Sequence, residues 1–387
     1  LIGFVAGKGV ETADAFYLGQ RKTQWWAIGV SVIATYISAL TFLGAPSWAY
    51  TDGFSVIALH SNYPLVIFVS ITLFLPFFYN SGVASIYEYQ ERRFGPKARG
   101  LIAAIFLVSQ SMTTAAILYA TALVIAFITG VDVVYSIIIV SAVTLVYTAL
   151  GGITSVIWTD VFQAGVLFLG AIIILFLLIH HLPMPLADTL AALKAQGKLN
   201  PLVFKLDFGR DTTVWAGVIA MTLYHVTVYG TNQMMVQRAL AAKSIGDAKK
   251  AYLTMGYAAF FIYFMFILMG VLFYSYYQGK EFEDTNTIIL QFAQGLAIPG
   301  LGGVLAAAVL AASMSTLASA LNSLATIATV DFYQKYYRKD GTPLHYLNAS
   351  RLFTIVFAIV TVIPAIALTH SKGSILLILS NIGSYFV

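Results

Sequence analysis

Long apolar runs separated by short polar segments dominate the chain. A helix needs about 20 apolar residues to cross a bilayer core, and runs near this length fall at 25–50, 54–79, 100–129, 133–150, 155–181, 213–235, 250–278, 301–330, 350–370 and from 374 onward. Transmembrane strands are excluded, because they alternate polar and apolar positions over about 10 residues. The pattern predicts an all-α polytopic protein, multi-pass in a cell membrane (plasma or inner) and in contact with its lipid bilayer.

Basic residues gather in alternate loops between these runs. One alternating set of loops holds 15 of the 21 Lys and Arg residues, and its segments are Lys8–Lys22, Asn80–Arg99, Val236–Lys250 and Phe332–Arg351. Because short cytoplasmic loops carry an excess of Lys and Arg, we expect this set to be cytoplasmic. The alternation also supports the number of runs, since a missed or extra span would break it.

The runs divide into two halves around a long loop, Leu182–Thr213. Five spans precede it and five follow, so the halves enter the membrane in opposite directions. This predicts one transport domain over 1–387, with one inverted repeat at about 25–181 and an incomplete second repeat at about 213–387. The apolar residues at both ends indicate a record truncated at each end.

The first span of each half carries polar residues and helix breakers at mid-depth. The segments are ATYISALTFLGAP, from Ala34 to Pro46, and LYHVTVYGTNQ, from Leu223 to Gln233. Interrupted helices in matching positions indicate a binding site at the bilayer midplane. The alternative is a pair of kinked packing helices, because Gly and Pro are tolerated in spans.

Composition narrows the classes of function. Charged residues make up 10% of the chain, against about 25% in soluble domains. The net charge of +5 belongs to loops, so it does not indicate nucleic-acid binding. There is no cysteine, which excludes disulfides and thiolate chemistry. HExxH and GxSxG motifs are absent as well, so we do not expect an enzyme.

The segment AASMSTLASALNS threads hydroxyls through an apolar span. Ala312, Ser315, Thr316 and Ser319 follow one another at i, i+3, i+4 and i+7, which places them on one helix face. Such a stripe is typical of a tight helix–helix seam. It is also suited to an alkali cation, because a hard cation prefers oxygen ligands and an interrupted helix near Ala34–Ile37 frees backbone carbonyls.

Several ionisable residues also lie inside spans. Asp160 is either an ion ligand, as buried charges in membranes often are, or a carboxylate near the cytoplasmic start of its helix. His60 and His225 are candidates for solute contact or ordinary packing residues. Arg238 is expected to be an interface anchor at a cytoplasmic helix end.

Four long segments together resemble the sodium/solute symporter family: YTALGGITSVIWTDVFQ, NQMMVQRALAAKSIGDAKK, ASIYEYQERRFG and SMSTLASALNSLATIATVDFY. The resemblance is greater to the iodide, multivitamin and monocarboxylate branch than to the galactose and sialic acid transporters. It implies a leucine-transporter-type fold with two inverted five-helix repeats and broken first helices. It also implies sodium-coupled import of a small solute by alternating access.

The resemblance assigns roles to individual residues. The main sodium site would use the carbonyls of Ala34, Ile37 and Ala312 with the hydroxyls of Ser315 and Thr316. Candidates for a second sodium site are Asp160 and Ser319, although Ala318 replaces another serine of that site. Candidate solute-binding positions are Tyr36, Thr41, His60, Thr113, His225, Tyr229 and Ala259.

The sequence therefore predicts a symporter whose partners are Na⁺ and a small-molecule solute, with a monocarboxylate or other small anion favoured. A sugar or amino-acid symporter, a sodium-sensing or channel-like protein, and proton coupling remain alternatives. One charge crossing 100 mV gains about 2.3 kcal/mol, and a tenfold sodium gradient gains about 1.4 kcal/mol. One sodium with a monoanion moves no net charge, so it concentrates that anion only about tenfold.

Overall fold

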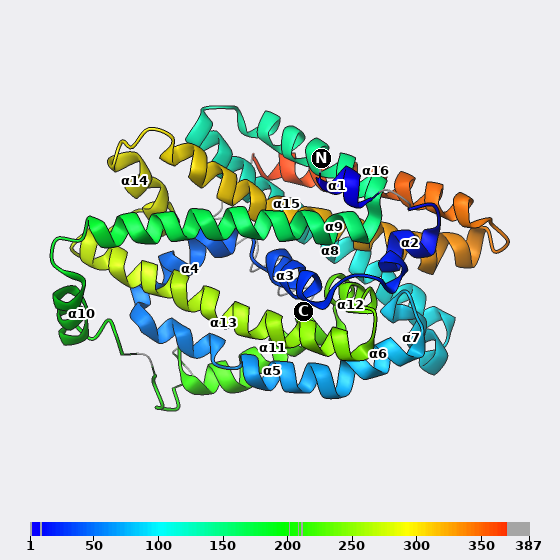
Figure 1. The fold of residues 1–387 in the computed structure, drawn as a ribbon, viewed down its shortest axis with the longest axis horizontal. Coiled ribbons are helices and arrows are strands. Elements are labelled where there is room, and N and C mark those ends of the chain that lie inside the picture. Colours follow the sequence, from blue (N-terminus) through cyan, green and yellow to red (C-terminus); the bar gives the residue numbers. More distant parts are fainter. Residues whose placement is uncertain (1, 8–9, 201, 208, 210–211, 370–387) are drawn as a thin grey trace.

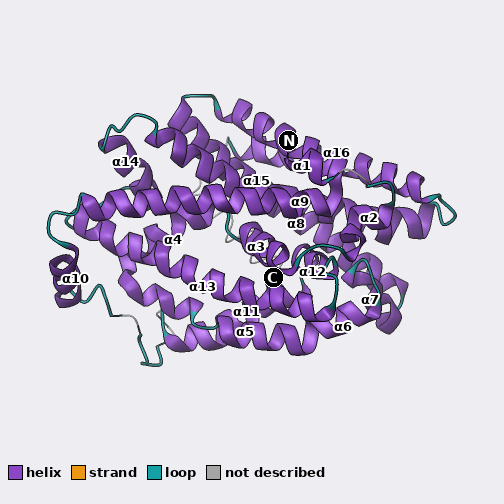
Figure 2. Cartoon of the chain, in the orientation of Figure 1, coloured by secondary structure: helices purple, strands orange, loops and turns teal. Residues whose placement is uncertain are grey.

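The computed structural model describes residues 2–7, 10–200, 202–207, 209 and 212–369, and these form a bundle of roughly parallel and antiparallel helices (Figure 1). Six described helical stretches are long and apolar enough to cross a membrane: Ala39–Ser81, Pro96–Thr129, Val133–His180, Ile245–Tyr276, Leu301–Tyr337 and Pro343–Leu368. The all-helical prediction agrees with the secondary structure in Figure 2. The span expected from 374 onward lies outside the described residues.

The first span of each half is broken, which is why neither half-helix is long enough to cross alone. In the first half, α3 (Trp25–Tyr36) ends before Ile37 and Ser38, both extended, and α4 (Ala39–Asp52) follows. In the second half, η4 (Ala216–Met221), α11 (Thr222–Val226) and η5 (Thr227–Thr231) lead to an extended Asn232, after which α12 (Gln233–Leu240) begins. The predicted interruptions are therefore present in both halves.

The first break lies where the sequence analysis expected it, near Ala34–Ile37, although the Gly and Pro of this segment lie elsewhere. Gly44 and Pro46 drew attention to this segment, yet both lie inside the continuous helix α4. The chain leaves the helix at Ile37 and Ser38 instead, where neither residue is a helix breaker. Tertiary packing, rather than local propensity, selects this point.

The stretch labelled α9 (Val133–His180) is two helices joined at Gly152. A straight helix of this length would extend about 72 Å, but Gly152 has φ 54° and ψ −153° and the chain turns back there (Figure 1). A Cβ on Gly152 would also lie 2.7 Å from the carbonyl oxygen of Phe16. Two reasons therefore require glycine, and the predicted spans 133–150 and 155–181 correspond to the two helices.

The remaining elements repeat in an inverted order. The second and third spans of the first half are η2 (Gly53–His60), α5 (Tyr63–Val69), η3 (Ser70–Phe74) and α6 (Leu75–Ser81), then α8 (Pro96–Thr129). Their counterparts in the second half are α13 (Ile245–Tyr276) and α15 (Leu301–Ile327). The stretch η7 (Ala328–Tyr337) continues α15, and α16 (Pro343–Leu368) is the next span.

The short helices in the loops also occupy corresponding positions in the two halves. Helix α7 (Ile86–Phe94) separates the second and third spans of the first half, and α14 (Ile288–Gly295), preceded by η6 (Thr285–Thr287), does so in the second. Figure 1 shows α7 and α14 at opposite ends of the bundle. The end with α7 also holds α2 (Ala13–Leu18), which follows α1 (Ile2–Ala6) and precedes η1 (Gly19–Arg21), whereas α10 (Leu186–Ala195) lies at the α14 end.

Candidate sodium and solute site

The hydroxyl stripe of α15 lies against the broken end of α3. The last helical hydrogen bond of α3 runs from the Ile37 N–H to the Ile33 carbonyl, so the next carbonyls have no partner within the helix. Thr316 Oγ1 donates to the Thr35 carbonyl oxygen at 2.9 Å and lies 3.3 Å from the Ala312 carbonyl oxygen. Neutral oxygens from two helices therefore converge where the helix is interrupted.

The donor set at this point suits an alkali cation. Carbonyl and hydroxyl oxygens are the ligands that a hard cation prefers, and unwound backbone coordinates the coupling ion in transporters of this plan. The side chains of Ser315 and Thr316 are buried, as are Ala34 and Ile37. The sodium ligands expected from the sequence thus lie on the two elements that meet here, although their coordination of an ion stays a prediction.

Asp160 and Arg238 form an ion pair that the sequence analysis did not foresee. Arg238 Nη2 lies 3.0 Å from Asp160 Oδ2, and both side chains are completely buried. Asp160 lies eight residues beyond the turn at Gly152, so it does not cap a helix start. The expectation that Arg238 anchors the chain at the membrane interface is wrong, because its guanidinium points into the protein and is neutralised there.

A second polar cluster lies beside the break and is built from rings. His225 Nε2 is 3.0 Å from the Tyr36 hydroxyl, and His225 Nδ1 is 2.9 Å from the Asn62 amide nitrogen. An amide nitrogen only donates, so Nδ1 accepts and a neutral His225 donates from Nε2 to Tyr36. Tyr36 directly follows Thr35, so the two clusters are joined through one residue step at the end of α3.

Stacked rings complete this cluster. The ring of His60 lies 3.6 Å from that of Tyr263, and the Tyr63 ring lies 5.1 Å from that of His225. Tyr229 lies 5.3 Å from Tyr36. Within this cluster, His60 Nδ1 and Asn62 Oδ1 have no hydrogen-bond partner among the described residues, and the hydroxyls of Tyr63 and Tyr229 interact only with each other. Buried polar atoms are normally paired, so their clustering here indicates a place for a polar ligand.

The candidate solute positions separate into two groups. Tyr36, His60, His225 and Tyr229 are brought together, and Thr41 neighbours Tyr263. The other two positions, Ala259 and Thr113, make no polar contact with the cluster. Ala259 is a buried apolar residue one turn before Tyr263. Thr113 is half-buried, and its side chain makes no hydrogen bond among the described residues.

Three residues of the cluster, Asn62, Tyr63 and Tyr263, were not predicted. No local pattern distinguishes them from the other polar and aromatic residues of their spans, because their role depends on which helices lie opposite. Asn62 and Tyr63 could have been noticed as neighbours of His60 at a helix interruption.

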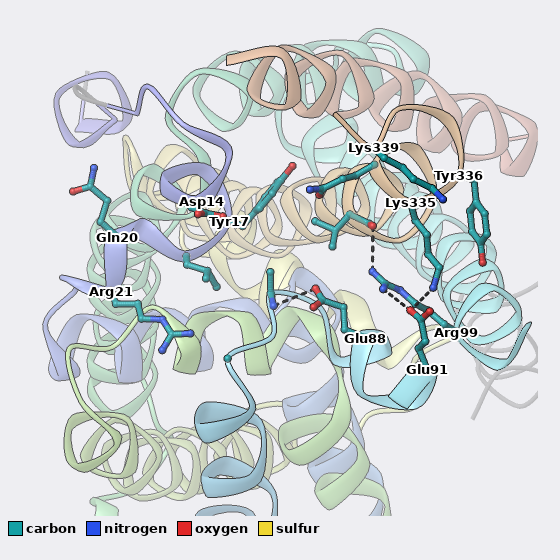
Figure 3. A pocket seen from close by; sticks show the side chains of 15 residues that line it. Asp14, Tyr17, Gln20, Arg21, Glu88, Glu91, Arg99, Lys335, Tyr336 and Lys339 are labelled. Carbon is teal, nitrogen blue, oxygen red and sulfur yellow. Dashed lines mark hydrogen bonds and ion pairs between the residues drawn. The ribbon is translucent and has the colours of Figure 1, made fainter. Parts of the chain in front are cut away.

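A cavity of about 940 Å³ opens at the end of the bundle where the basic loops gather (Figure 3). Glu91 and Arg99 meet there at 2.8 Å, Lys335 also pairs with Glu91, and Arg99 Nε lies 2.5 Å from Asp331. Hydrogen bonds from Lys335 and Arg99 hold the pKa of the Glu91 carboxyl below its ordinary value. These pairs join α7, α8 and η7, so they fasten the expected cytoplasmic ends together.

Two broken helices in an inverted repeat, with hydroxyls of a later helix at one break, define a secondary transporter of leucine-transporter type. A model of the sodium:solute symporter family matches residues 16–387. The chain therefore belongs to the sodium:solute symporter family, whose members are symporters and not enzymes.

Individual relatives agree with this assignment. The chain is 28% identical over 366 residues to sodium-coupled monocarboxylate transporter 2 of Danio rerio, covering 92% of this chain and 58% of that one. It is 28% identical over 380 residues to the sodium/sialic acid symporter SiaT of Proteus mirabilis (strain HI4320), covering 96% and 76%. The chain thus spans little more than half the length of the monocarboxylate transporter.

A solved structure shows the same fold. It is a substrate-bound, outward-open state of a Na⁺-coupled sialic acid symporter, and it superimposes with a TM-score of 0.89 at 27% identity. The alignment covers 100% of this chain and 82% of that one. The fold expected from the sequence is confirmed.

Proposed function

We propose that this chain forms the core of a sodium-coupled symporter that imports a small organic solute by alternating access. The observation that carries this proposal is the contact between Thr316 and the Thr35 carbonyl, which places the hydroxyl stripe at the helix break. In the proposed site, sodium binds the carbonyls of Ala34, Ile37 and Ala312 and the hydroxyls of Ser315 and Thr316.

The adjacency of the two clusters provides the coupling. A sodium ion drawn to the end of α3 fixes the backbone of Thr35, and the next residue, Tyr36, presents its hydroxyl to His225. Ordering of this segment by sodium therefore shapes the solute site, and a bound solute holds the segment in the form that binds sodium. Coupling of this kind is reciprocal, so each ligand raises the affinity for the other.

The cluster favours a small carboxylate as the solute. The hydroxyls of Tyr63 and Tyr229 interact with each other, which uses one of their two protons, and His60 has a ring nitrogen without a partner among the described residues. The remaining hydroxyl proton and the His60 ring can donate to a carboxylate. No Lys or Arg side chain contacts these rings among the described residues, so the nearby sodium ion would balance the negative charge. The relatives named above transport a monocarboxylate and sialic acid, which supports the same class.

Uptake by proteoliposomes under imposed gradients tests the function. Labelled lactate, pyruvate, sialic acid, galactose and proline are each offered with an inward gradient of sodium, of protons, or of neither. Sodium-driven uptake of a carboxylate is the expected result. Proton-driven uptake would overturn the choice of ion, sodium-driven uptake of sugar or proline would overturn the solute class, and sodium flux without any coupled solute would indicate a channel-like protein.

A further inference from the structure

Arg238 occupies the surroundings in which the sequence analysis placed a second sodium ion. Its Nη2 donates to Asp160 Oδ2 and also to Ser319 Oγ, and these are the two groups expected to hold that ion. Its Nε donates to Ser31 Oγ at 2.8 Å and its Nη1 to the Met234 carbonyl at 2.6 Å. One guanidinium thus connects α12 with α3, α9 and α15.

The oxygens of Asp160 are already engaged. Oδ2 accepts from Ser31 at 2.6 Å and from Arg238 at 3.0 Å, with Thr35 Oγ1 at 3.4 Å, and Oδ1 accepts from Ser315 at 2.7 Å. A sodium ion at this carboxylate would displace these donors and lie beside a fixed positive charge. Like charges at such separations in a buried site repel strongly.

We infer that Arg238 is a tethered cation that takes the place of a second coupled sodium, and that Asp160 is a positioning residue for the first. This inference rests on the proposed function. Ser315 has a single proton, and it points to Asp160 Oδ1. The lone pairs of the Ser315 oxygen are then free for the sodium ion at the end of α3, as with the outer-shell carboxylates that orient metal ligands elsewhere.

The stoichiometry follows from this arrangement. With one mobile sodium, a monocarboxylate is carried without net charge, and its accumulation is limited to the size of the sodium gradient. An anionic solute that is driven by a single sodium ion is therefore accumulated only modestly. Replacement of the second Ser ligand by Ala318 agrees with this, because the position lacks a further oxygen.

Equilibrium binding of radiolabelled sodium to the purified protein tests the inference without a solute. We expect one sodium bound per chain, with a Hill coefficient of one. Two sodium ions per chain would overturn it. A protein that binds no sodium at all would instead overturn the proposed function, so the two failures are distinguishable.

Variants separate positioning from direct binding. Removing one partner alone leaves an unpaired buried charge and endangers folding, so the double variant Asp160→Asn with Arg238→Gln is used. We expect its sodium affinity to fall at least tenfold with one ion still bound. Unchanged affinity would contradict the positioning role, and loss of one of two bound ions would show that Asp160 is a ligand.

Two further proteins serve as a matched control and a conservative rescue. The double variant Arg99→Gln with Asp331→Asn removes another buried ion pair, at the end of the bundle that holds α7, and sodium affinity should stay within twofold of the wild type. Arg238→Lys keeps the tethered charge but makes fewer hydrogen bonds. Its sodium affinity should lie between those of the wild type and the neutral double variant, whereas an affinity as low as that of the double variant would overturn the role of the charge.

Discussion

The hydroxyl of Thr316 lies 2.9 Å from the backbone carbonyl oxygen of Thr35, across 281 residues of sequence. One partner is a side chain on an intact helix, and the other is a carbonyl without a helical partner because its own helix ends one residue later, at Tyr36. This contact places a hydroxyl of the continuous helix α15 against the end of α3, where the backbone carbonyls have no helical partner. Ion binding at such a junction acts on the backbone of α3 directly, and through Tyr36 on the ring cluster.

Removing the two adjacent hydroxyls of α15 should strongly weaken the dependence of uptake on sodium. In Ser315→Ala with Thr316→Ala, two of the proposed sodium ligands are lost, so we expect the sodium concentration for half-maximal uptake to rise more than tenfold. Sodium titration of uptake in proteoliposomes measures this. Ser313→Ala is the control, because the Ser313 hydroxyl faces Thr121 on α8. Equal sodium dependence in all three proteins would reject the site.

The Tyr36 hydroxyl should matter for the solute and not for the ion. Tyr36→Phe keeps the ring but removes the partner of His225 Nε2, so we expect a solute affinity lower by about five- to twentyfold, equivalent to one lost hydrogen bond of about 1–2 kcal/mol. Sodium binding without solute should be unchanged. Tyr50→Phe, whose hydroxyl donates to the Lys280 carbonyl, should retain wild-type solute affinity.

Gln237 should be a stability residue at the core of the bundle. Its amide nitrogen donates to the Tyr17 carbonyl, Asn322 and Thr326, and its oxygen accepts from Ser323. Gln237→Leu removes these bonds and leaves Asn322 Oδ1 and Ser323 Oγ without them, at about 1–3 kcal/mol for an unsatisfied buried group. The melting temperature in detergent should fall by several degrees. A melting temperature equal to that of the wild type would show that water or rearrangement replaces the lost bonds.

The turn at Gly152 offers a paired test of backbone strain. Gly152→Ala places a Cβ at positive φ and against Phe16, which should cost at least about 1–3 kcal/mol and reduce the yield of folded protein. Gly165→Ala lies on the same stretch with no atom within 4 Å of the added Cβ, so it should leave stability unchanged or slightly raised, since alanine favours helices. Size-exclusion profiles and melting temperatures compare the two.

The ion pairs of Glu91 should stabilise the protein only when this carboxyl is ionised. Because its pKa is lowered in the folded state, its contribution is present above the ordinary value of 4.5 and is lost as the pH falls through the lowered value. The melting temperature of Glu91→Gln should therefore lie below that of the wild type at pH 7, and the difference should shrink below pH 4.5. A difference independent of pH would contradict this assignment.

Periodicity and composition were sufficient for the membrane class and the all-helical, inverted plan, because bilayer thickness acts on each segment separately. They also identified the α15 stripe, since i, i+3, i+4 spacing defines a helix face whatever lies opposite. The break was expected near Ala34–Ile37 and lies at Ile37 and Ser38, but the residue types at that point do not explain it. Gly44 and Pro46, the local signals, lie within helix.

Contacts between residues far apart in the sequence decided which buried polar side chains pair with one another. Arg238 looked like an interface residue because its sequence neighbours are those of a loop end, yet the fold places it against Asp160, 78 residues away. Asn62, Tyr63 and Tyr263 carry no local signal for the ring cluster that they help to build. The sequence alone determined which segments are apolar enough to cross a membrane, because that depends on the transfer of each segment into lipid. Only the tertiary structure decided which buried polar atoms meet, because burial makes each one require a partner that only the fold can supply.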